Sequence, residues 1–282
     1  MILRQVAVVS ETSKISFKEL SRVSAALQKQ AMRDLGPVWE IQATVDAFAD
    51  LEDVPVGTWP IIVEENINVE DAAGVHEDSD GQPFALVTAG PGWSLTASHE
   101  LIEMLVDPFG RRITEGQSPM PGQGRVQFLV EPCDPSEAAQ FAYVINGVTV
   151  SDFYTPKYFA TAFNPADQYS HTGAIKKPRQ VLKGGYLSWH DPVTDHWFQE
   201  TFFTGNTPKF RDLGKLTASA KSFRRQIYDV TSEAFKVRRP KGPELKAAST
   251  ALTAAAAPMN SRANLWREQI AAIKAGKTQE PA

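Results

Sequence analysis

The chain has 282 residues, of which 42% are hydrophobic, 22% charged and 10% aromatic, a composition typical of a globular protein with a large core. Its apolar runs are far shorter than the roughly 20 residues that a membrane-spanning helix needs, so we expect no membrane span. The single cysteine, Cys133, excludes an intramolecular disulfide framework and a zinc site built from several cysteines. A metal would therefore have to bind to histidines and carboxylates.

The formal net charge of −4 is unevenly distributed. Residues 1–210 carry 15 Lys and Arg against 27 Asp and Glu, whereas residues 211–243 carry nine against three. An acidic body argues against a nucleic-acid partner, because phosphate contacts need a basic surface. The apolar residues 1–9 lack a basic flank and a small-residue cleavage site, so we expect a strand there rather than a signal peptide. This pattern predicts a cytoplasmic protein, or a virion protein if a phage encodes it.

The first part of the chain predicts one helix among several strands. Ser16 and Glu19 form a capping box, and apolar residues follow at helical spacing as far as Leu27, so we expect a helix that ends at Gly36-Pro37. Alternating or β-branched runs between turn residues predict strands at 3–10, 38–48, 58–64 and 83–88, with a turn at 78–81 before the last.

A second helix is predicted in the middle of the chain. Residues 94–106 contain neither Gly nor Pro and lie between Gly90-Pro91-Gly92 and Asp107-Pro108, with Ser94 or Thr96 as the expected N-cap. After it we expect a loop at 110–124, strands at 126–130 and 141–150, an irregular segment at 152–183, a hairpin from 186–189 and 196–203, and helices at 215–236 and 260–275 on either side of an alanine-rich stretch at 247–257.

The predicted helix at 94–106 carries the residues with the strongest chemical pattern. His99 and Glu103 are four residues apart, so an imidazole and a carboxylate lie on one face of the helix and can converge on one cation. Glu100 is offset by one residue, which is the position of the general base in the H-E-x-x-H motif. A carboxylate replaces the second histidine of that motif here.

These residues belong to a longer pattern. Ser98-His99-Glu100, Glu103 and Asp107-Pro108, followed after a Gly-rich loop by Glu131 and Asp134, resemble the S-H-E-x-x-E-x-x-x-D-P…E-x-x-D pattern of bacterial and phage proteins related to zincin metallopeptidases. The resemblance covers roughly residues 1–155, where the order strand, helix, three strands, active-site helix also agrees. It implies an α+β fold with a zincin-like mixed sheet, an active-site helix and a C-terminal helical extension.

The resemblance also implies a metal site and a reaction. His99 and Glu103 would hold zinc, or another divalent cation, and Glu131 is the expected third ligand because it arrives after a strand. Asp134 would hold His99 or a loop in place, and Asp107, about 12 Å of helix rise beyond His99, would support the site from outside it. Zinc-bound water would then attack a peptide carbonyl with Glu100 as general base, in a peptide or protein substrate. His76 and His171 are further candidate ligands.

Other interpretations stay open. A single His-Glu-x-x-Glu is common by chance, and the helix could carry only a buried histidine and a solvated acidic face. The chain could keep the zincin fold without turnover, as a structural or interaction protein, for example a component of a phage particle. A nucleic-acid enzyme with magnesium held by Glu100, Glu103, Asp107 and Asp134 fits the acidic body less well.

The change of charge divides the chain into two predicted parts. Residues 1–210 form the expected metal-binding domain, and residues 211–282 form a basic and alanine-rich helical extension. The basic residues of the extension could bind nucleic acid, an acidic partner or an assembly partner. The charge pattern slightly favours a helix that docks on the acidic body of its own chain.

Overall fold

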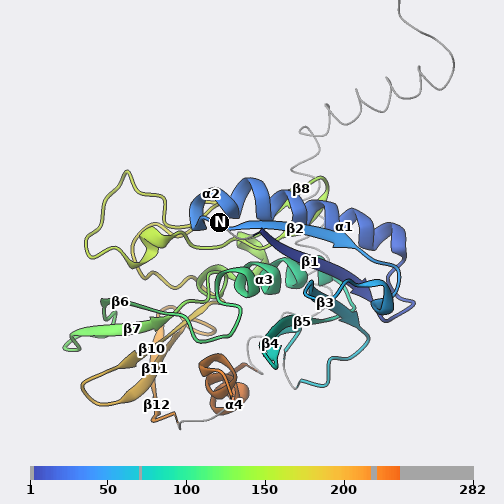
Figure 1. Ribbon diagram of the computed structural model, residues 1–282. Helices are drawn as coiled ribbons and strands as arrows, with labels where there is room; N and C mark the ends of the chain where they lie inside the picture. The colour runs from blue at the N-terminus through green and yellow to red at the C-terminus, as the bar shows by residue number, and fades with distance from the viewer. Residues whose placement is uncertain (1–2, 70–71, 217–220, 236–282) are drawn as a thin grey trace, which may run out of the picture.

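The computed structural model describes residues 3–69, 72–216 and 221–235, and these residues form a mixed α+β fold (Figure 1). The first sheet has the strand order β2-β1-β3-β5-β4. Its four strands β2, β1, β3 and β5 are parallel, and β4 at the edge is antiparallel to β5. The bounds are β1 (Leu3–Ser10), β2 (Gln42–Ala47), β3 (Trp59–Glu64), β4 (Gly74–Ser79) and β5 (Gln82–Thr88).

The second sheet is antiparallel and has the order β12-β11-β10-β7-β6. It is formed by β6 (Ile113–Gln117), β7 (Arg125–Leu129), β10 (Tyr186–Asp191), β11 (His196–Thr201) and β12 (Lys209–Gly214). A separate hairpin consists of β8 (Tyr143–Ile145) and β9 (Val148–Val150).

Four α-helices accompany the sheets within the described residues: α1 (Phe17–Lys29), α2 (Gly36–Trp39), α3 (Trp93–Val106) and α4 (Phe223–Phe235). Ser16 caps α1 by accepting a hydrogen bond from the backbone N–H of Glu19, as the capping box predicts. A π-helical turn, Gln30–Leu35, joins α1 to α2. Short 3-10 turns lie at Leu51–Asp53, Asp134–Ser136, Ala139–Phe141 and Pro156–Phe159.

The main core lies between one face of the first sheet and the helices α1 and α3. Alternate residues of four strands supply that face, because successive side chains of a strand point to opposite sides of the sheet. α3 is buried on most of its circumference, so its polar residues are held in place by the core on either side of them. The alternate strand residues of this core are Val6, Val8, Ala43, Val45, Ile61, Val63, Ala85 and Val87.

A second core fills the space between the antiparallel sheet and the irregular segment 152–183. Tyr154 and Tyr158 are fully buried there, with stacked rings 4.3 Å apart. The aromatic residues of this segment therefore stabilise the fold rather than line an open cleft, apart from the exposed Phe163.

Several predicted elements are confirmed, and others are corrected. The strand at 3–10, the helix after Ser16 and the hairpin from 186 to 203 are present. The helical region continues past Gly36-Pro37, because proline is tolerated in the first turn of α2, and this shortens the next strand to β2. Gly92, not Ser94 or Thr96, is the N-cap of α3. Three edge strands, β4, β6 and β12, are absent from the prediction. Because of β4, four strands rather than three separate α1 from α3.

The later part of the chain differs from the prediction in similar ways. The expected strand at 141–150 is the hairpin β8–β9, with Asn146 and Gly147 in left-handed conformations at its turn. β12 spans the predicted boundary at residue 210, and the helix expected at 215–236 is the shorter α4. The alanine-rich stretch and the helix predicted at 260–275 lie outside the described residues.

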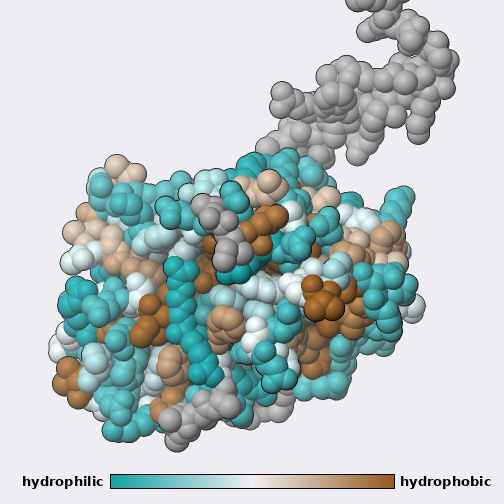
Figure 2. Space-filling model, in the orientation of Figure 1, coloured by the Kyte–Doolittle hydropathy of each residue, from teal (hydrophilic) through white to brown (hydrophobic). Residues whose placement is uncertain are grey.

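Hydrophilic residues cover most of the visible face of the molecule, and hydrophobic residues show there in separate groups (Figure 2). Within the part of the chain that the structure describes, no helix is both long and apolar enough to cross a membrane.

Candidate metal centre

α3 brings His99 and Glu103 together as the helical spacing predicts. The Nε2 atom of His99 lies 3.1 Å from Oε1 of Glu103. The Glu103 side chain is fully buried, and that of His99 is 13% exposed. Neighbouring residues of α3 are packed into the main core and hold this pair in place. His99 lines a cavity, and Glu103 is buried beside it.

The segment after β7 brings two carboxylates to the same pair. Asp134 Oδ1 lies 3.4 Å from His99 Nε2. The oxygens of Glu103, Glu131 and Asp134 include a set that lies within 4.8 Å of one another. Gly185 allows the turn that carries Asp134 to pack directly on the start of β10, since a Cβ at this position would lie 2.6 Å from the carbonyl oxygen of Asp134.

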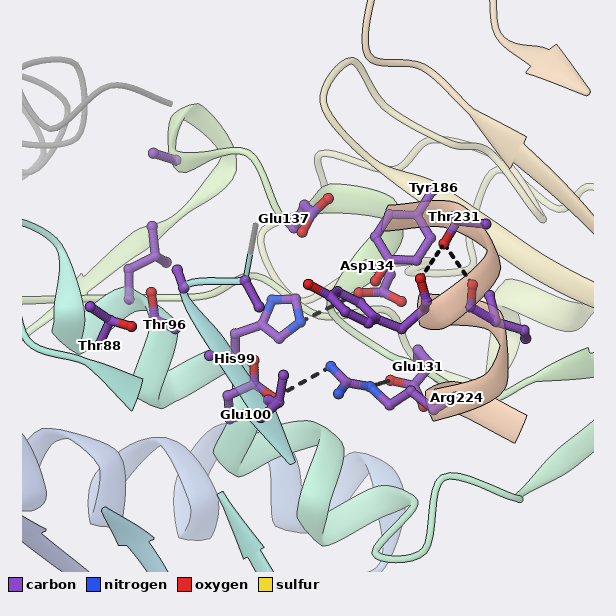
Figure 3. Close-up of a pocket in the computed structure, with 18 of the residues that line it drawn as sticks. Thr88, Thr96, His99, Glu100, Glu131, Asp134, Glu137, Tyr186, Arg224 and Thr231 are labelled. Atoms are coloured by element: carbon purple, nitrogen blue, oxygen red, sulfur yellow. Dashed lines mark hydrogen bonds and ion pairs between the residues drawn. The ribbon is translucent and has the colours of Figure 1, made fainter. Parts of the chain in front are cut away.

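α4 supplies a positive charge to this acidic group. Arg224 donates from Nε to Glu131 at 2.9 Å, and its Nη2 lies 3.2 Å from Glu103 Oε2 and 3.4 Å from Glu100 Oε2. Figure 3 shows the guanidinium pointing between Glu100 and Glu131. The next residue, Arg225, bonds to Glu77 of β4 and to Asp229. α4 thus docks its basic residues on carboxylates of its own chain, the arrangement that the charge pattern slightly favours.

β4 contributes His76, whose ring is fully buried beside α3. Its Nε2 lies 3.1 Å from the backbone carbonyl oxygen of Asp107. Its Nδ1 lies 3.4 Å from Glu100 Oε2 and 3.7 Å from Glu103 Oε2. The sequence pattern indicates His76 only as a further candidate ligand. It lies in an edge strand with a polar sequence, and no local pattern predicts that this strand packs beside α3.

Asp107 itself stays outside the acidic group. Its carboxylate accepts hydrogen bonds from the backbone N–H groups of Arg111 and Arg112, at 3.0 and 2.8 Å. These hydrogen bonds fix the turn after α3. They thereby also fix the Asp107 carbonyl oxygen that accepts the hydrogen bond of His76. His171 lies elsewhere, stacked on Phe153 with ring centroids 5.1 Å apart.

Crowding of like charges shifts the pKa values of these groups. Burial lowers the pKa of His99, but the charge of Glu103 and the close polar contacts with Asp134 and Glu103 outweigh it and raise that pKa well above its ordinary value. Burial raises the pKa of Glu103, yet the charges of His99 and Arg224 bring it below its ordinary value. Burial and the charge of Glu103 raise the pKa of Asp134 to about 6 and that of Glu131 well above its usual range. The group is therefore short of positive charge.

A cavity of about 310 Å³ opens beside these residues. Its walls come from the start of β4, from α3, from the segment after β7, from the start of β10 and from α4. His99, Glu100, Glu131 and Asp134 all line it (Figure 3). The acidic group is therefore open to a small molecule or a segment of chain that enters between the two sheets.

Comparison of the chain with protein-family models, with curated proteins and with solved structures finds no match.

Proposed function

We propose that the protein is a zinc-dependent metallopeptidase with a zincin-like arrangement of its first sheet and α3. Zinc, or another divalent cation, would be held by His99, Glu103 and a carboxylate of the segment after β7. The spacing of the candidate ligand atoms carries this proposal. Two atoms bound at 2.0–2.1 Å to a tetrahedral zinc lie roughly 3.4 Å apart. The distances from His99 Nε2 to Glu103 and Asp134 are 3.1 and 3.4 Å.

The third ligand is the point at which geometry and sequence pattern favour different residues. The sequence predicts Glu131, which lies in the same group of oxygens but bonds to Arg224. Glu131 and Asp134 each keep one oxygen without a hydrogen bond among the described residues, but Asp134 faces His99 directly, so we place it as the third ligand. Asp134→Ala should then abolish zinc binding, whereas Glu131→Ala should retain it. The reverse result would restore Glu131 as the ligand.

Glu100 is the residue best placed to move a proton. Its carboxylate is buried but lines the cavity, beside the proposed ligands. Bound zinc would polarise a peptide carbonyl and lower the pKa of a water molecule. Glu100 would accept the proton of the attacking water and later deliver it to the leaving amine.

The cavity wall supports a peptide as the substrate. Among the described residues β4 pairs only with β5, so it is an edge strand, and residues 72–75 at its start line the cavity. The outer edge of such a strand presents backbone N–H and C=O groups that an extended peptide can bind as an added strand. A peptide bound in this way would pass beside Glu100 and His99.

Metal content tests the proposal first. Protein purified without chelator or nickel resin should contain one zinc per chain by inductively coupled plasma mass spectrometry, and His99→Ala should contain none. A fluorogenic casein assay should show cleavage that Glu100→Gln abolishes while zinc is retained. Absence of zinc in the wild type, even after zinc is added back, would contradict the metal site.

The second candidate function is a non-catalytic zincin-fold protein with a structural or interaction role. The position of Arg224 favours it, because the guanidinium already supplies positive charge to three carboxylates without a metal. A protein of this kind would show no casein cleavage in the presence of zinc and would form a defined assembly in size-exclusion light scattering.

A further inference from the structure

The acidic group contains more ligand atoms than one cation can use. The two oxygens of Glu103 face different partners: Oε1 faces His99, whereas Oε2 faces His76 and Arg224. On the Oε2 side, His76, Glu100 and Glu103 each offer an atom within 4.8 Å of the other two, and all three residues are buried. This second set shares only Glu103 with the proposed zinc ligands His99 and Asp134.

The hydrogen bonding of His76 fixes which ring nitrogen is available. A backbone carbonyl can only accept, so Nε2 of His76 must carry the proton that it donates to Asp107. In the neutral ring the lone pair is then on Nδ1. That atom is fully buried, has no hydrogen-bond partner among the described residues, and points at the carboxylates of Glu100 and Glu103.

A lone pair that faces two carboxylates is repelled by them unless Nδ1 takes up a second proton or a cation lies between the three groups. Histidines that bind metals almost always donate their other N–H to a carbonyl or carboxylate, and His76 shows this arrangement. Its distance of 3.4 Å from Glu100 Oε2 is also the separation expected for two ligands of one tetrahedral cation, and 3.7 Å to Glu103 Oε2 is slightly longer. Arg224 Nη2 lies against the same two oxygens, so its guanidinium supplies positive charge at this place in the structure.

We propose that His76, Glu100 and Glu103 form a second divalent-cation site that shares the Glu103 carboxylate with the first, and that Arg224 and the second cation exclude each other from it. The inference rests on the proposed function for the first site, and the two sites differ in that only the second uses His76 and Glu100 as ligands. When the second cation binds, Glu100 becomes a ligand and no longer accepts a proton. The second cation is therefore an inhibitor of the proposed reaction, and Arg224 in the same place keeps Glu100 free of metal.

Zinc stoichiometry tests the second site without an activity assay. After equilibrium dialysis against zinc and mass spectrometry of the bound metal, wild type should hold one tightly bound zinc and Arg224→Met two. Arg224→Met combined with His76→Gln should return to one, and combined with His99→Ala should also hold one. Arg225→Met, a change of the neighbouring arginine on the same helix, should bind as wild type does.

The outcomes separate the two proposals. One zinc in Arg224→Met that is lost with His99→Ala and kept with His76→Gln overturns the second site and leaves the first. One zinc that is lost with His76→Gln and kept with His99→Ala supports the second site and overturns the first. No zinc in any variant overturns both.

Wild-type protein provides an independent route if Arg224→Met does not fold. A second zinc should bind to wild type more weakly than the first, because it must displace Arg224, and His76→Gln should remove this weaker binding alone. A zinc titration monitored by calorimetry measures the binding of the first and of the second zinc. Weak binding that persists unchanged in His76→Gln overturns the inference.

Discussion

Replacement of Arg224 by methionine should destabilise the metal-free protein strongly. Methionine keeps much of the apolar stem of the arginine, so the change removes mainly the charge. The guanidinium contacts Glu100, Glu103 and Glu131, whose side chains are at most 7% exposed. Removal of one partner from a buried ion pair costs about 3–5 kcal/mol. At roughly 2–4 °C per kcal/mol for a chain of this size, the melting temperature should fall by about 10 °C.

Differential scanning fluorimetry in EDTA and then in zinc measures this effect. Zinc binds only the folded state and replaces the missing positive charge, so it should raise the melting temperature of Arg224→Met by more than that of wild type. Arg225→Met is the matched control, because Arg225 is on the same helix and its ion pairs are about one third exposed. Such pairs contribute about 1 kcal/mol or less. If Arg224→Met in EDTA loses no more stability than Arg225→Met, Arg224 does not stabilise the fold by balancing the charge of the buried carboxylates.

Three further changes test other parts of the structure. Gly74→Ala places a Cβ 2.6 Å from Thr96 Cγ2 and 2.9 Å from Glu100 Cγ, so it should displace Glu100. Casein cleavage should fall while zinc content is retained. Unchanged cleavage would show that Glu100 is not the base. Burial raises the pKa of Glu200 to about 7 from an ordinary 4.5, so ionisation opposes folding above pH 7 and not below pH 4.5. At about 1.4 kcal/mol per pKa unit, Glu200→Gln should be about 3–4 kcal/mol more stable than wild type at pH 8 and equal to it at pH 4. Urea unfolding that shows the same difference at both pH values would contradict this. Ser98→Ala removes two buried hydrogen bonds, at 2.7 and 2.8 Å, and should cost about 1–3 kcal/mol in the same assay, whereas a smaller loss would mean that water replaces them.

The elements that the sequence predicts best have strong local signals. α1 follows from a capping box and a regular apolar repeat, and α3 from a run without Gly or Pro between two breaks. β4 and β6 are not predicted because each is an edge strand with a largely polar sequence. The sequence of β4 is GVHEDS and that of β6 is ITEGQ. Their strand conformation depends on a neighbouring strand rather than on an intrinsic pattern.

The candidate site shows the same division between local and long-range information. His99, Glu100 and Glu103 follow from helical spacing within five residues of sequence. The proximity of Asp134 to His99 is not encoded by any local spacing, and it depends on the turn after β7 packing against Gly185. His76 and Arg224 come from segments 148 residues apart that meet only in the folded molecule. Charge asymmetry suggested that a basic helix docks on the body, but not which carboxylates it would reach.

The separation of Arg224 from its partners along the chain has a consequence for how the protein folds. The three carboxylates that it contacts lie 93, 121 and 124 residues away, and such contacts form only after the loops between them have closed. Until α4 docks, these carboxylates must stay hydrated or protonated, because burial of unpaired charges is strongly unfavourable. The carboxylates of the acidic centre therefore lose their hydration only when α4, the last described helix, docks. By the same reasoning, the earliest partial opening of the native protein should be the release of α4, which rehydrates the centre while both sheets remain intact.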